Sequence, residues 1–557
     1  MLHRSLVCMF VLITATTLAA QQPAKLPDTP IDVARLTAHV KEISSDAYEG
    51  RGPGTRAEPK VVDYLSKQLA AAGVQPGGEP DGRGGRKWTQ AVTLVRSEAT
   101  GPMTASVAVS GSTIALKQGD QIAIRATQLP SSRVTIKGAP LVFLGYGVNA
   151  PERRWDDFKG LDVRGKVLVV LINDPDFDAD LGKRFDGKAM TYYGRWTYKF
   201  EEAARRGAAG VLIVHETAPA SYGWATVKNS NTAEIMDVVR DKPADVHPQL
   251  EAWIQRDVAV DLFKRAGLNF DAEKKKAQSQ AFKPVPLGNA TLSLDYAVKQ
   301  TKLTSSNVIG LLKGTGHPEE VVIYSAHWDH LGIGAPDARG DRIYNGARDN
   351  GTGVASVLEL ARVFGKAPRT DRSVAFMFVT AEEQGLLGSE YLGQHPPIPA
   401  GQIALDLNYD AIQPFGDPLD VTLTGADRTT FFPNVQATAK AFDLAIDPEA
   451  HPEAGTYYRS DHFSLARVGI PSFSIDEGTL YAGHDAAWGL AKDDDYTAHR
   501  YHTPMDNYTP DMDFTGNAKL ARFGMDLGWQ ALTAPHTITW RPKDEFLPAR
   551  EKSLSTK

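Results

Sequence analysis

Histidine and carboxylate side chains recur along the second half of the chain, each directly after an apolar run or in a glycine-rich loop. The residues are His327, Asp349, Glu382, Glu383, Asp410 and His502. Taken singly, each has an ordinary structural explanation, since an aspartate often caps a helix and glutamates favour a helix start. Together they offer nitrogen and oxygen ligands suited to zinc, enough for two ions that share one carboxylate. The pattern therefore indicates metal-assisted hydrolysis.

Three near-continuous apolar runs, at residues 308–312, 321–324 and 374–379, predict strands that are buried on both faces. The second and third runs, and a further strand predicted at residues 403–407, directly precede polar residues of this set. A helix is predicted over residues 353–364, because Val354, Val357 and Leu358 lie at helical spacing. We therefore expect an α/β fold with a mixed, mainly parallel sheet flanked by helices. In such sheets, sites form beyond the carboxyl ends of the strands, so the polar residues should converge there.

The first half of the chain contains two further regions. Helices are predicted over residues 31–43 and 61–72, and short alternating strands over residues 92–136. Residues 138–286 are predicted to form a second α/β unit. Its elements are a strand at 166–171, a helix at 200–206 and a strand at 210–214.

Composition excludes several classes of function. The chain has 557 residues, 42% of them apolar and 23% charged, which is typical of a globular protein with more than one folding unit. Its net charge of −6 does not indicate a nucleic-acid partner or an anionic membrane.

The only cysteine, Cys8, lies in a segment with a basic start, an apolar stretch and small residues, which predicts a signal peptide over residues 1–20. The alternative is a membrane anchor, but the apolar run is shorter than the ~18–20 residues that a span needs. We expect a secreted or periplasmic protein with no membrane attachment after cleavage. Without cysteine, the mature chain would hold a metal through nitrogen and oxygen alone.

At these motifs the sequence resembles the co-catalytic di-zinc exopeptidases, a family that includes secreted leucyl aminopeptidases and glutamate carboxypeptidase. The matching stretches, in the family's order, are residues 49–52, 326–329, 346–353, 381–389, 408–410, 460–462 and 502–504. Residues 138–286 resemble the protease-associated domain at positions 145–147, 165–167 and 204–210. The expected organisation is a signal peptide (1–20), an N-terminal part of the peptidase domain (21–137), an inserted protease-associated domain (138–286) and the zinc peptidase domain (287–557).

The resemblance implies a role for each matching residue. Asp349 would bridge two Zn²⁺ ions, with His327 and Asp410 completing one site, and Glu383 and His502 the other. Two more residues have implied roles: Glu382 would be the general base for a metal-bound water, and Asp329 would hydrogen-bond His327. Asp406 is a competing ligand, but only Asp410 lies in the Asn-x-Asp pattern. Arg348 departs from the family, in which many members carry an acidic residue beside the bridging aspartate.

A tyrosine upstream of the Ser-Asp-His motif is a candidate donor to the oxyanion. Tyr457 lies at the family-like spacing, although Tyr458 is adjacent and both could simply line the pocket. We expect an aminopeptidase that acts on peptide substrates, and the sequence leaves the side-chain preference and oligomeric state open.

The main alternative is a carboxypeptidase, which needs a cation for the substrate's terminal carboxylate, and Arg348 and Arg459 are candidates. A non-catalytic receptor-like relative or a glutaminyl cyclase fits less well, because neither needs the complete ligand set.

Overall fold

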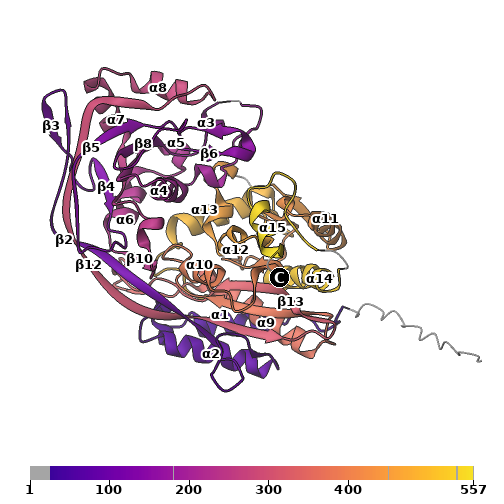
Figure 1. The fold of residues 1–557 in the computed structure, drawn as a ribbon. Coiled ribbons are helices and arrows are strands. Elements are labelled where there is room, and N and C mark those ends of the chain that lie inside the picture. Colours follow the sequence, from indigo (N-terminus) through magenta and orange to yellow (C-terminus); the bar gives the residue numbers. More distant parts are fainter. Residues whose placement is uncertain (1–25, 180, 449–450, 535–536, 556–557) are drawn as a thin grey trace, which may run out of the picture.

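The computed structural model describes residues 26–179, 181–448, 451–534 and 537–555. The predicted signal peptide lies outside these ranges. The fold is built on one large sheet of 14 strands, and helices pack on its faces (Figure 1). None of the described helices is long and apolar enough to cross a membrane.

The half of the sheet that carries the predicted catalytic residues, which we call the catalytic half, has the strand order β20-β17-β13-β16-β12. The bounds are β13 His317–His327, β16 Arg372–Val379, β17 Ile403–Asn408 and β20 Ser472–Ser474, while β12 spans Val285–Leu312. The first four strands are mutually parallel, and β12 runs antiparallel to β16. The prediction of a mixed, mainly parallel α/β sheet is confirmed.

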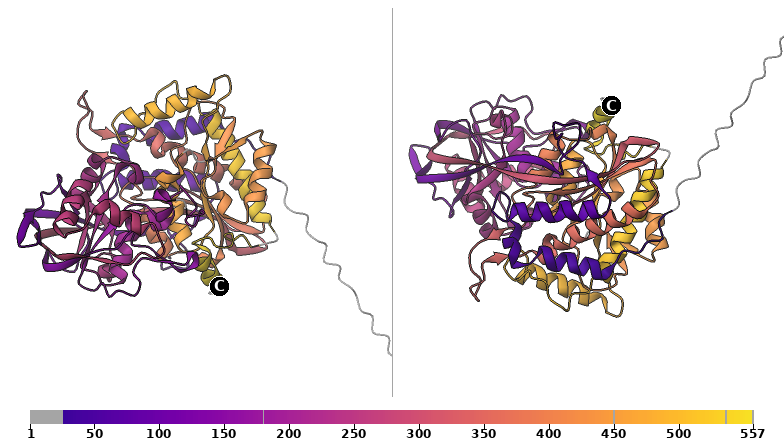
Figure 2. Two further views of the ribbon diagram at one scale, coloured as in Figure 1. Left: turned by 90° about the horizontal axis from the view of Figure 1, so that it is seen from above. Right: turned by 90° about the horizontal axis from the view of Figure 1, so that it is seen from below.

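Helices cover both faces of this half. One face packs against α1 (Val33–Ile43), α2 (Glu58–Ala71), α9 (Gly353–Lys366) and α14 (Thr515–Thr533) around the largest apolar core. The other face packs against α10 (Leu387–Gln394) and α12 (His462–Arg467). Seen from below, the indigo helices α1 and α2 lie beside the long strands (Figure 2).

Two very long strands connect the catalytic half to a second unit. Strand β2 (Thr89–Val109) pairs antiparallel with β12 along nearly its whole length (Figure 1). Beyond β12 the sheet continues in the order β5-β8-β9-β11-β4. The second unit, from β3 to α8, therefore extends the same sheet, and the predicted domain boundaries stay predictions.

The second unit has alternating strands and helices. Its strands are β3 Ser112–Ala115, β4 Ile122–Arg125, β5 Arg133–Phe143, β8 Val167–Leu171, β9 Gly210–His215, β10 Ile235–Val238 and β11 Leu250–Gln255. Its helices are α3 Pro175–Asp178, α4 Trp196–Arg205, α5 Thr217–Ala220, α6 Trp224–Thr232, α7 Arg256–Arg265 and α8 Phe270–Ala277. The C-terminal region adds β18 Asp420–Thr422, α11 Phe432–Ala441, β19 Ala445–Asp447, β21 Asp476–Glu477, α13 Ala486–His499 and α15 Leu547–Ser555.

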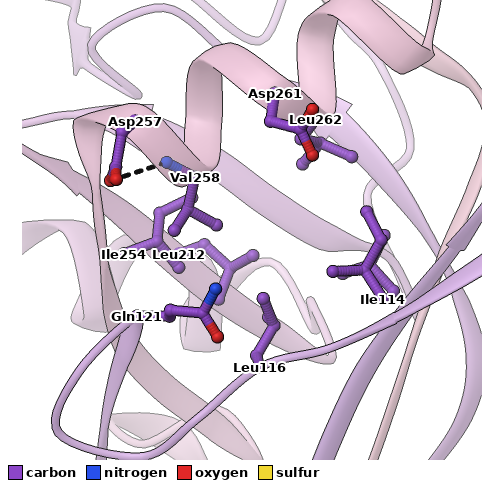
Figure 3. Close-up of a pocket in the computed structure, with 10 residues that line it drawn as sticks. Ile114, Leu116, Gln121, Leu212, Ile254, Asp257, Val258, Asp261 and Leu262 are labelled. Carbon is purple, nitrogen blue, oxygen red and sulfur yellow. Dashed lines mark hydrogen bonds between the residues drawn. The ribbon is translucent and has the colours of Figure 1, made fainter.

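A small cavity of about 150 Å³ lies in the second unit, between the β-strands and α7. Figure 3 shows Leu116, Leu212, Ile254 and Leu262 around it, with Asp257 bonded to the backbone of its own helix. Because its walls are mainly apolar and include none of the predicted site residues, the cavity is separate from the candidate active site.

Candidate active site

Three neighbouring parallel strands end at the same edge of the sheet. His327 is the last residue of β13 and pairs with Val379, the last residue of β16. On the other side, Ser325 of β13 pairs with Asn408, the last residue of β17. Glu382 and Asp410 follow these ends within three residues, so the side chains meet there.

His327, Asp349 and Asp410 form the first group. His327 Nε2 lies 3.0 Å from Asp410 Oδ1 and 3.2 Å from Asp349 Oδ1. Their ligand atoms lie within 4.8 Å of one another, as a single metal ion requires. Ser460 Oγ donates to the other oxygen of Asp410 at 2.6 Å and fixes its orientation.

Asp349, Glu383 and His502 form the second group. The other carboxylate oxygen of Asp349, Oδ2, lies 3.3 Å from His502 Nε2, which is 2.9 Å from Glu383 Oε2. Asp349 thus presents one oxygen to His327 and one to His502. This is the arrangement expected of a carboxylate that bridges two sites.

A third histidine, His330, belongs to the cluster and was missed by the sequence reasoning. Its Nδ1 lies 2.6 Å from Glu383 Oε1, and it forms a further possible metal-binding group with Asp349 and Glu383. The only available signal was its position three residues after His327. His330 is completely buried, so its ring orients Glu383 from the protein side.

The loop that carries Asp349 is held by neighbouring side chains rather than by regular helix. It lies in the irregular turn Ala347–Thr352 before α9, and the Asp349–Asn350 peptide is cis. The backbone amides of Arg348 and Asp349 both donate to the Asp506 carboxylate at 3.0 Å. Asn350 Nδ2 donates to the carbonyl of Tyr409, which ties this loop to the loop of Asp410.

Arg51 supports the same loop from within the core. Its fully buried guanidinium donates to the backbone carbonyls of Trp328, Ile43 and Gly346 at 2.8–3.0 Å, and also to that of Asn345. Burial lowers the pKa of Arg51 to about 10, and the nearby carboxylates keep it charged at neutral pH. Arg51 thus fixes the segments on both sides of the cluster.

The adjacent residues Glu382 and Glu383 have opposite proton affinities. Burial, together with the charges of Asp410 and Glu383, raises the pKa of Glu382 well above its usual value. Burial also acts on Glu383, but His330 and His502 outweigh it and lower its pKa to about 2. Neighbouring carboxyls with such divergent pKa values are typical of an acid–base residue beside a fixed anion.

Asp329 lies within the cluster and contacts His327 through its main chain. His327 Nδ1 lies 3.1 Å from the backbone oxygen of Asp329, and the nearer carboxylate oxygen is 3.9 Å away. That carboxylate instead accepts the backbone amide of Glu382 at 3.1 Å. Asp329 therefore connects the first ligand to the residue predicted as the base.

The two predicted tyrosines point elsewhere. The hydroxyl of Tyr457 donates to the carbonyl of Ser472 at 3.2 Å, and that of Tyr458 donates to Glu545 at 2.7 Å. In contrast, the ring of Tyr501 stacks on His502 with centroids 3.8 Å apart. The structure thus brings a tyrosine to the cluster that sequence reasoning did not select, although Tyr501 directly precedes His502.

The competing residues also have other partners. Asp406 accepts a hydrogen bond from Ser325 at 2.7 Å and belongs to no described group that could hold a metal. Arg348 forms an ion pair with Asp493 at 3.1 Å, and its guanidinium lies 3.9 Å from the ring centre of Tyr496. Arg348 is therefore occupied by interactions within its own half.

The residues at this edge fit zinc. The donor atoms are imidazole nitrogens and carboxylate oxygens, which zinc accepts in tetrahedral sites. The buried Nε2 atoms of His330 and His502 have no hydrogen-bond partner of good geometry among the described residues. Burial opposes protonation of His327, yet Asp410 and Glu382 raise its pKa well above the usual range, which marks an excess of negative charge that a cation would balance.

Comparison with known proteins relates the region of the site to peptidases. Residues 307–522, which contain this cluster except Arg51, match the family model of Peptidase family M28. A "probable leucine aminopeptidase 2" of Aspergillus oryzae is 31% identical over 232 residues, 40% of this chain and 44% of that protein. A "Probable lipoprotein aminopeptidase LpqL" of Mycobacterium tuberculosis is 31% identical over 258 residues, 40% of this chain and 47% of that protein. The matches thus span less than half of these relatives.

A solved structure, the aminopeptidase from Aneurinibacillus sp. strain AM-1, aligns over 92% of this chain and 97% of its own. The identity is 19% and the TM-score 0.48. The family-model match and the two aminopeptidase relatives show that residues 307–522 of this chain are related in sequence to peptidases of family M28.

Proposed function

We propose that the protein is a zinc-dependent exopeptidase, specifically an aminopeptidase that hydrolyses the N-terminal peptide bond of peptides. The observation that carries this proposal is the position of Asp349, whose two oxygens face different histidines. The sequence relation to named aminopeptidases supports the same conclusion.

In this proposal five residues hold two zinc ions. His327 and Asp410 serve one, Glu383 and His502 the other, and Asp349 both. Bound zinc would lower the pKa of a water molecule towards neutrality and polarise the scissile carbonyl. His330 keeps Glu383 oriented through the 2.6 Å contact between their side chains.

Glu382 is the proposed general base. Its side chain is 11% exposed and reaches the edge of the cluster, where Oε2 lies 3.9 Å from His327 Nε2. Its high proton affinity suits a group that takes a proton from the attacking water and passes it to the leaving nitrogen. Asp329 positions the backbone of Glu382, a contact consistent with an indirect role.

Tyr501 is a better candidate than Tyr457 for the donor to the oxyanion. Although 44% of the Tyr501 surface is exposed, desolvation of its phenol and the charges of Asp349 and Glu383 raise the pKa of Tyr501 well above its usual value. The hydroxyl therefore stays protonated and can donate a hydrogen bond. Tyr457 has a partner in Ser472 and would have to break that bond to act.

We infer the preference for a free N-terminus from the sequence relation to named aminopeptidases. Glu383 and Asp410 are assigned to zinc in this proposal, so Glu382 is the carboxylate of this set that stays free to face the substrate's ammonium group. We also propose that the protein is secreted or periplasmic and that residues 138–286 form a protease-associated domain, both of which rest on the sequence motifs.

The experiment that tests this function compares peptides blocked at one end. The zinc-loaded protein should cleave a peptide with a free N-terminus, and acetylation of that terminus should remove nearly all cleavage. A chelator should abolish the activity, and added Zn²⁺ should restore it. Cleavage of the acetylated peptide at the rate of the free one would contradict the aminopeptidase assignment.

A further inference from the structure

The proposed ligand His502 reaches the candidate metal site from a different kind of segment than the other ligands. Its side chain is 35% exposed, whereas those of the other four proposed ligands are between 1% and 19% exposed. His327, Glu383 and Asp410 lie at or just after the ends of buried strands. His502 instead follows helix α13, which ends at His499 (Figure 1). The position of His502 therefore depends on how α13 is attached to the protein.

Helix α13 buries few of its side chains. Of its 14 residues, Gly489 and Tyr496 are the buried ones. Near its beginning, Trp488 packs edge-on against Phe415 and Tyr481, with ring centroids 6.1 Å and 5.5 Å apart. A helix with so little buried apolar surface gains little from the hydrophobic effect and is among the segments that open locally most easily. Polar contacts therefore matter for the attachment of its second half.

The second half of α13 is held by the guanidinium of Arg348. Arg348 Nη2 forms an ion pair with Asp493 Oδ1 at 3.1 Å, and the guanidinium carbon lies 3.9 Å from the ring centre of Tyr496. Asp493 and Tyr496 are three positions apart, so both lie on one face of the helix. Gln413 Nε2 donates to the same oxygen of Asp493 at 3.0 Å. Because the Arg348 side chain is 9% exposed and that of Asp493 42%, the pair joins the surface helix to buried structure.

Arg348 belongs to the loop of the proposed bridging ligand, because it directly precedes Asp349. Its Nε donates to the carbonyl of Ala411, in the loop that follows β17, at 2.8 Å. One oxygen of Asp506 accepts the backbone amide of Arg348 at 3.0 Å, and the other accepts the hydroxyl of Tyr496 at 3.1 Å. Arg348 thus connects α13 to the segment that carries Asp349.

The end of α13 extends this attachment to His502. The backbone amide of Tyr501 donates to the carbonyl of Tyr496 at 2.9 Å. One turn of backbone therefore links the residue that stacks on Arg348 to the residue before His502. The ring of Tyr501, the proposed donor to the oxyanion, stacks on His502 with centroids 3.8 Å apart. A shift of α13 would move the ligand and this donor together.

We propose that Arg348 is a positioning residue, which holds α13 through Asp493 and thereby places His502 for the second zinc ion. This inference rests on the proposed function and deepens it, because it names the contact on which the second ion depends. Ligands at the ends of core strands keep their places without α13, so the first ion binds independently of this contact. An acidic side chain at position 348 could not form the ion pair with Asp493.

The first test measures the affinity of the two zinc ions separately. Wild type, Asp493→Ala and Arg348→Gln are titrated with Zn²⁺ in a metal buffer, and Asp494→Ala is the matched control because Asp494 is an exposed neighbour on the same helix. Asp493→Ala and Arg348→Gln should raise the Kd of one ion by about 10- to 100-fold, the usual cost of losing a group that orients a metal ligand. The Kd of the other ion, and both values for Asp494→Ala, should match wild type. Unchanged affinity in Asp493→Ala, or equal weakening of both ions, would overturn the inference.

Two double variants show whether the effect passes through the pair and through His502. Asp493→Ala should have a much smaller effect in the Arg348→Gln background than in wild type, because the partner is already lost. It should have no further effect on zinc in the His502→Ala background, because the ligand that it positions is gone. Equal effects of Asp493→Ala in all backgrounds would overturn the inference.

A further test needs neither zinc nor activity. In hydrogen–deuterium exchange of the metal-free protein, residues 486–502 should exchange about 5- to 30-fold faster in Asp493→Ala than in wild type, as expected when a locally opening segment loses a modest stabilising contact. Strands β13 and β16 should exchange as in wild type. Unchanged exchange of residues 486–502 would show that the pair does not hold α13. Faster exchange throughout the chain with a clear fall in the thermal midpoint would assign Asp493 to the fold as a whole, and either result would overturn the inference.

Failure of this inference and failure of the proposed function give different results. Wild type that binds no zinc and cleaves no peptide would refute the proposed function and remove the inference with it. Two zinc ions and peptide cleavage in wild type, with the same zinc affinities in Asp493→Ala, would overturn the role of Arg348 alone.

Discussion

Substitution of Arg51 by methionine tests whether the loop of Asp349 depends on a buried scaffold. Arg51 is 0% exposed, and its guanidinium satisfies the backbone carbonyls of Ile43, Trp328, Asn345 and Gly346. Methionine fills much of the same volume but donates no hydrogen bond. The change therefore isolates the polar contacts from the packing.

The expected magnitude follows from those four acceptors. Each buried carbonyl left without a partner costs about 1–3 kcal/mol, and partial entry of water favours the lower end. A total loss of about 4 kcal/mol is a large share of the ~5–15 kcal/mol that typically holds a domain folded. Because two of the carbonyls, those of Asn345 and Gly346, directly precede the Asp349 loop, zinc binding should weaken as well.

Thermal unfolding followed by circular dichroism, zinc content after dialysis and kcat together test this reasoning. Arg51→Lys keeps the charge but not the fork and should lose less stability. Arg56→Gln, which changes an exposed arginine that pairs with Glu49, is the matched control and should behave as wild type. An Arg51→Met protein with unchanged thermal midpoint and zinc content would refute the scaffold role.

Three further predictions concern the site itself. Glu382→Gln should keep zinc but lose about 10²–10⁴-fold in kcat, whereas Glu383→Gln should lose zinc. If metal analysis and kinetics show the reverse pattern, the roles of the two residues are exchanged. Tyr501→Phe should lower kcat more than Tyr457→Phe, and equal kcat for Tyr501→Phe and wild type would exclude the oxyanion role. In the metal-free protein, Glu383 and Asp349 raise the pKa of His502 from 6.5 to about 10, although burial acts in the opposite direction. Protonated His502 therefore stabilises the fold fully below pH 6.5, and this stabilisation is lost as the pH rises to 10. Thermal midpoints of the chelator-treated protein should fall over this range while those of the zinc-loaded protein do not, and parallel profiles would contradict this.

The catalytic half of the fold was predictable because its signals are local. The apolar runs at 374–379 and 403–407 became β16 and β17, and the helix predicted at 353–364 is α9. Strand β12, 28 residues long, was not anticipated as one element. Its middle around Lys299, Gln300 and Thr301 is exposed and polar, so it lacks the pattern of a buried strand.

Some features of the candidate site could likewise be predicted from the sequence, and others could not. The convergence of His327 and Asp410 follows from strand ends and that of Asp349 from the glycine-rich loop that opens α9, so it could be predicted. The contacts of His330 and Arg51 could not be predicted. His330 contacts Glu383 and Arg51 contacts backbone carbonyls, and no sequence pattern indicates either pairing. Tyr457 was selected by spacing alone, and its hydroxyl is bonded to Ser472 instead of facing the cluster. Sequence position does not fix where a side chain points.

The zinc stoichiometry of the intact, folded protein is the most direct test of the central claim. Native mass spectrometry after exhaustive dialysis, with activity measured on the same sample, should give two zinc ions per chain. Asp349→Asn, which removes the charge of the proposed bridging residue, should lower occupancy of both sites together. A fully active wild-type protein with one zinc ion or none would contradict the account.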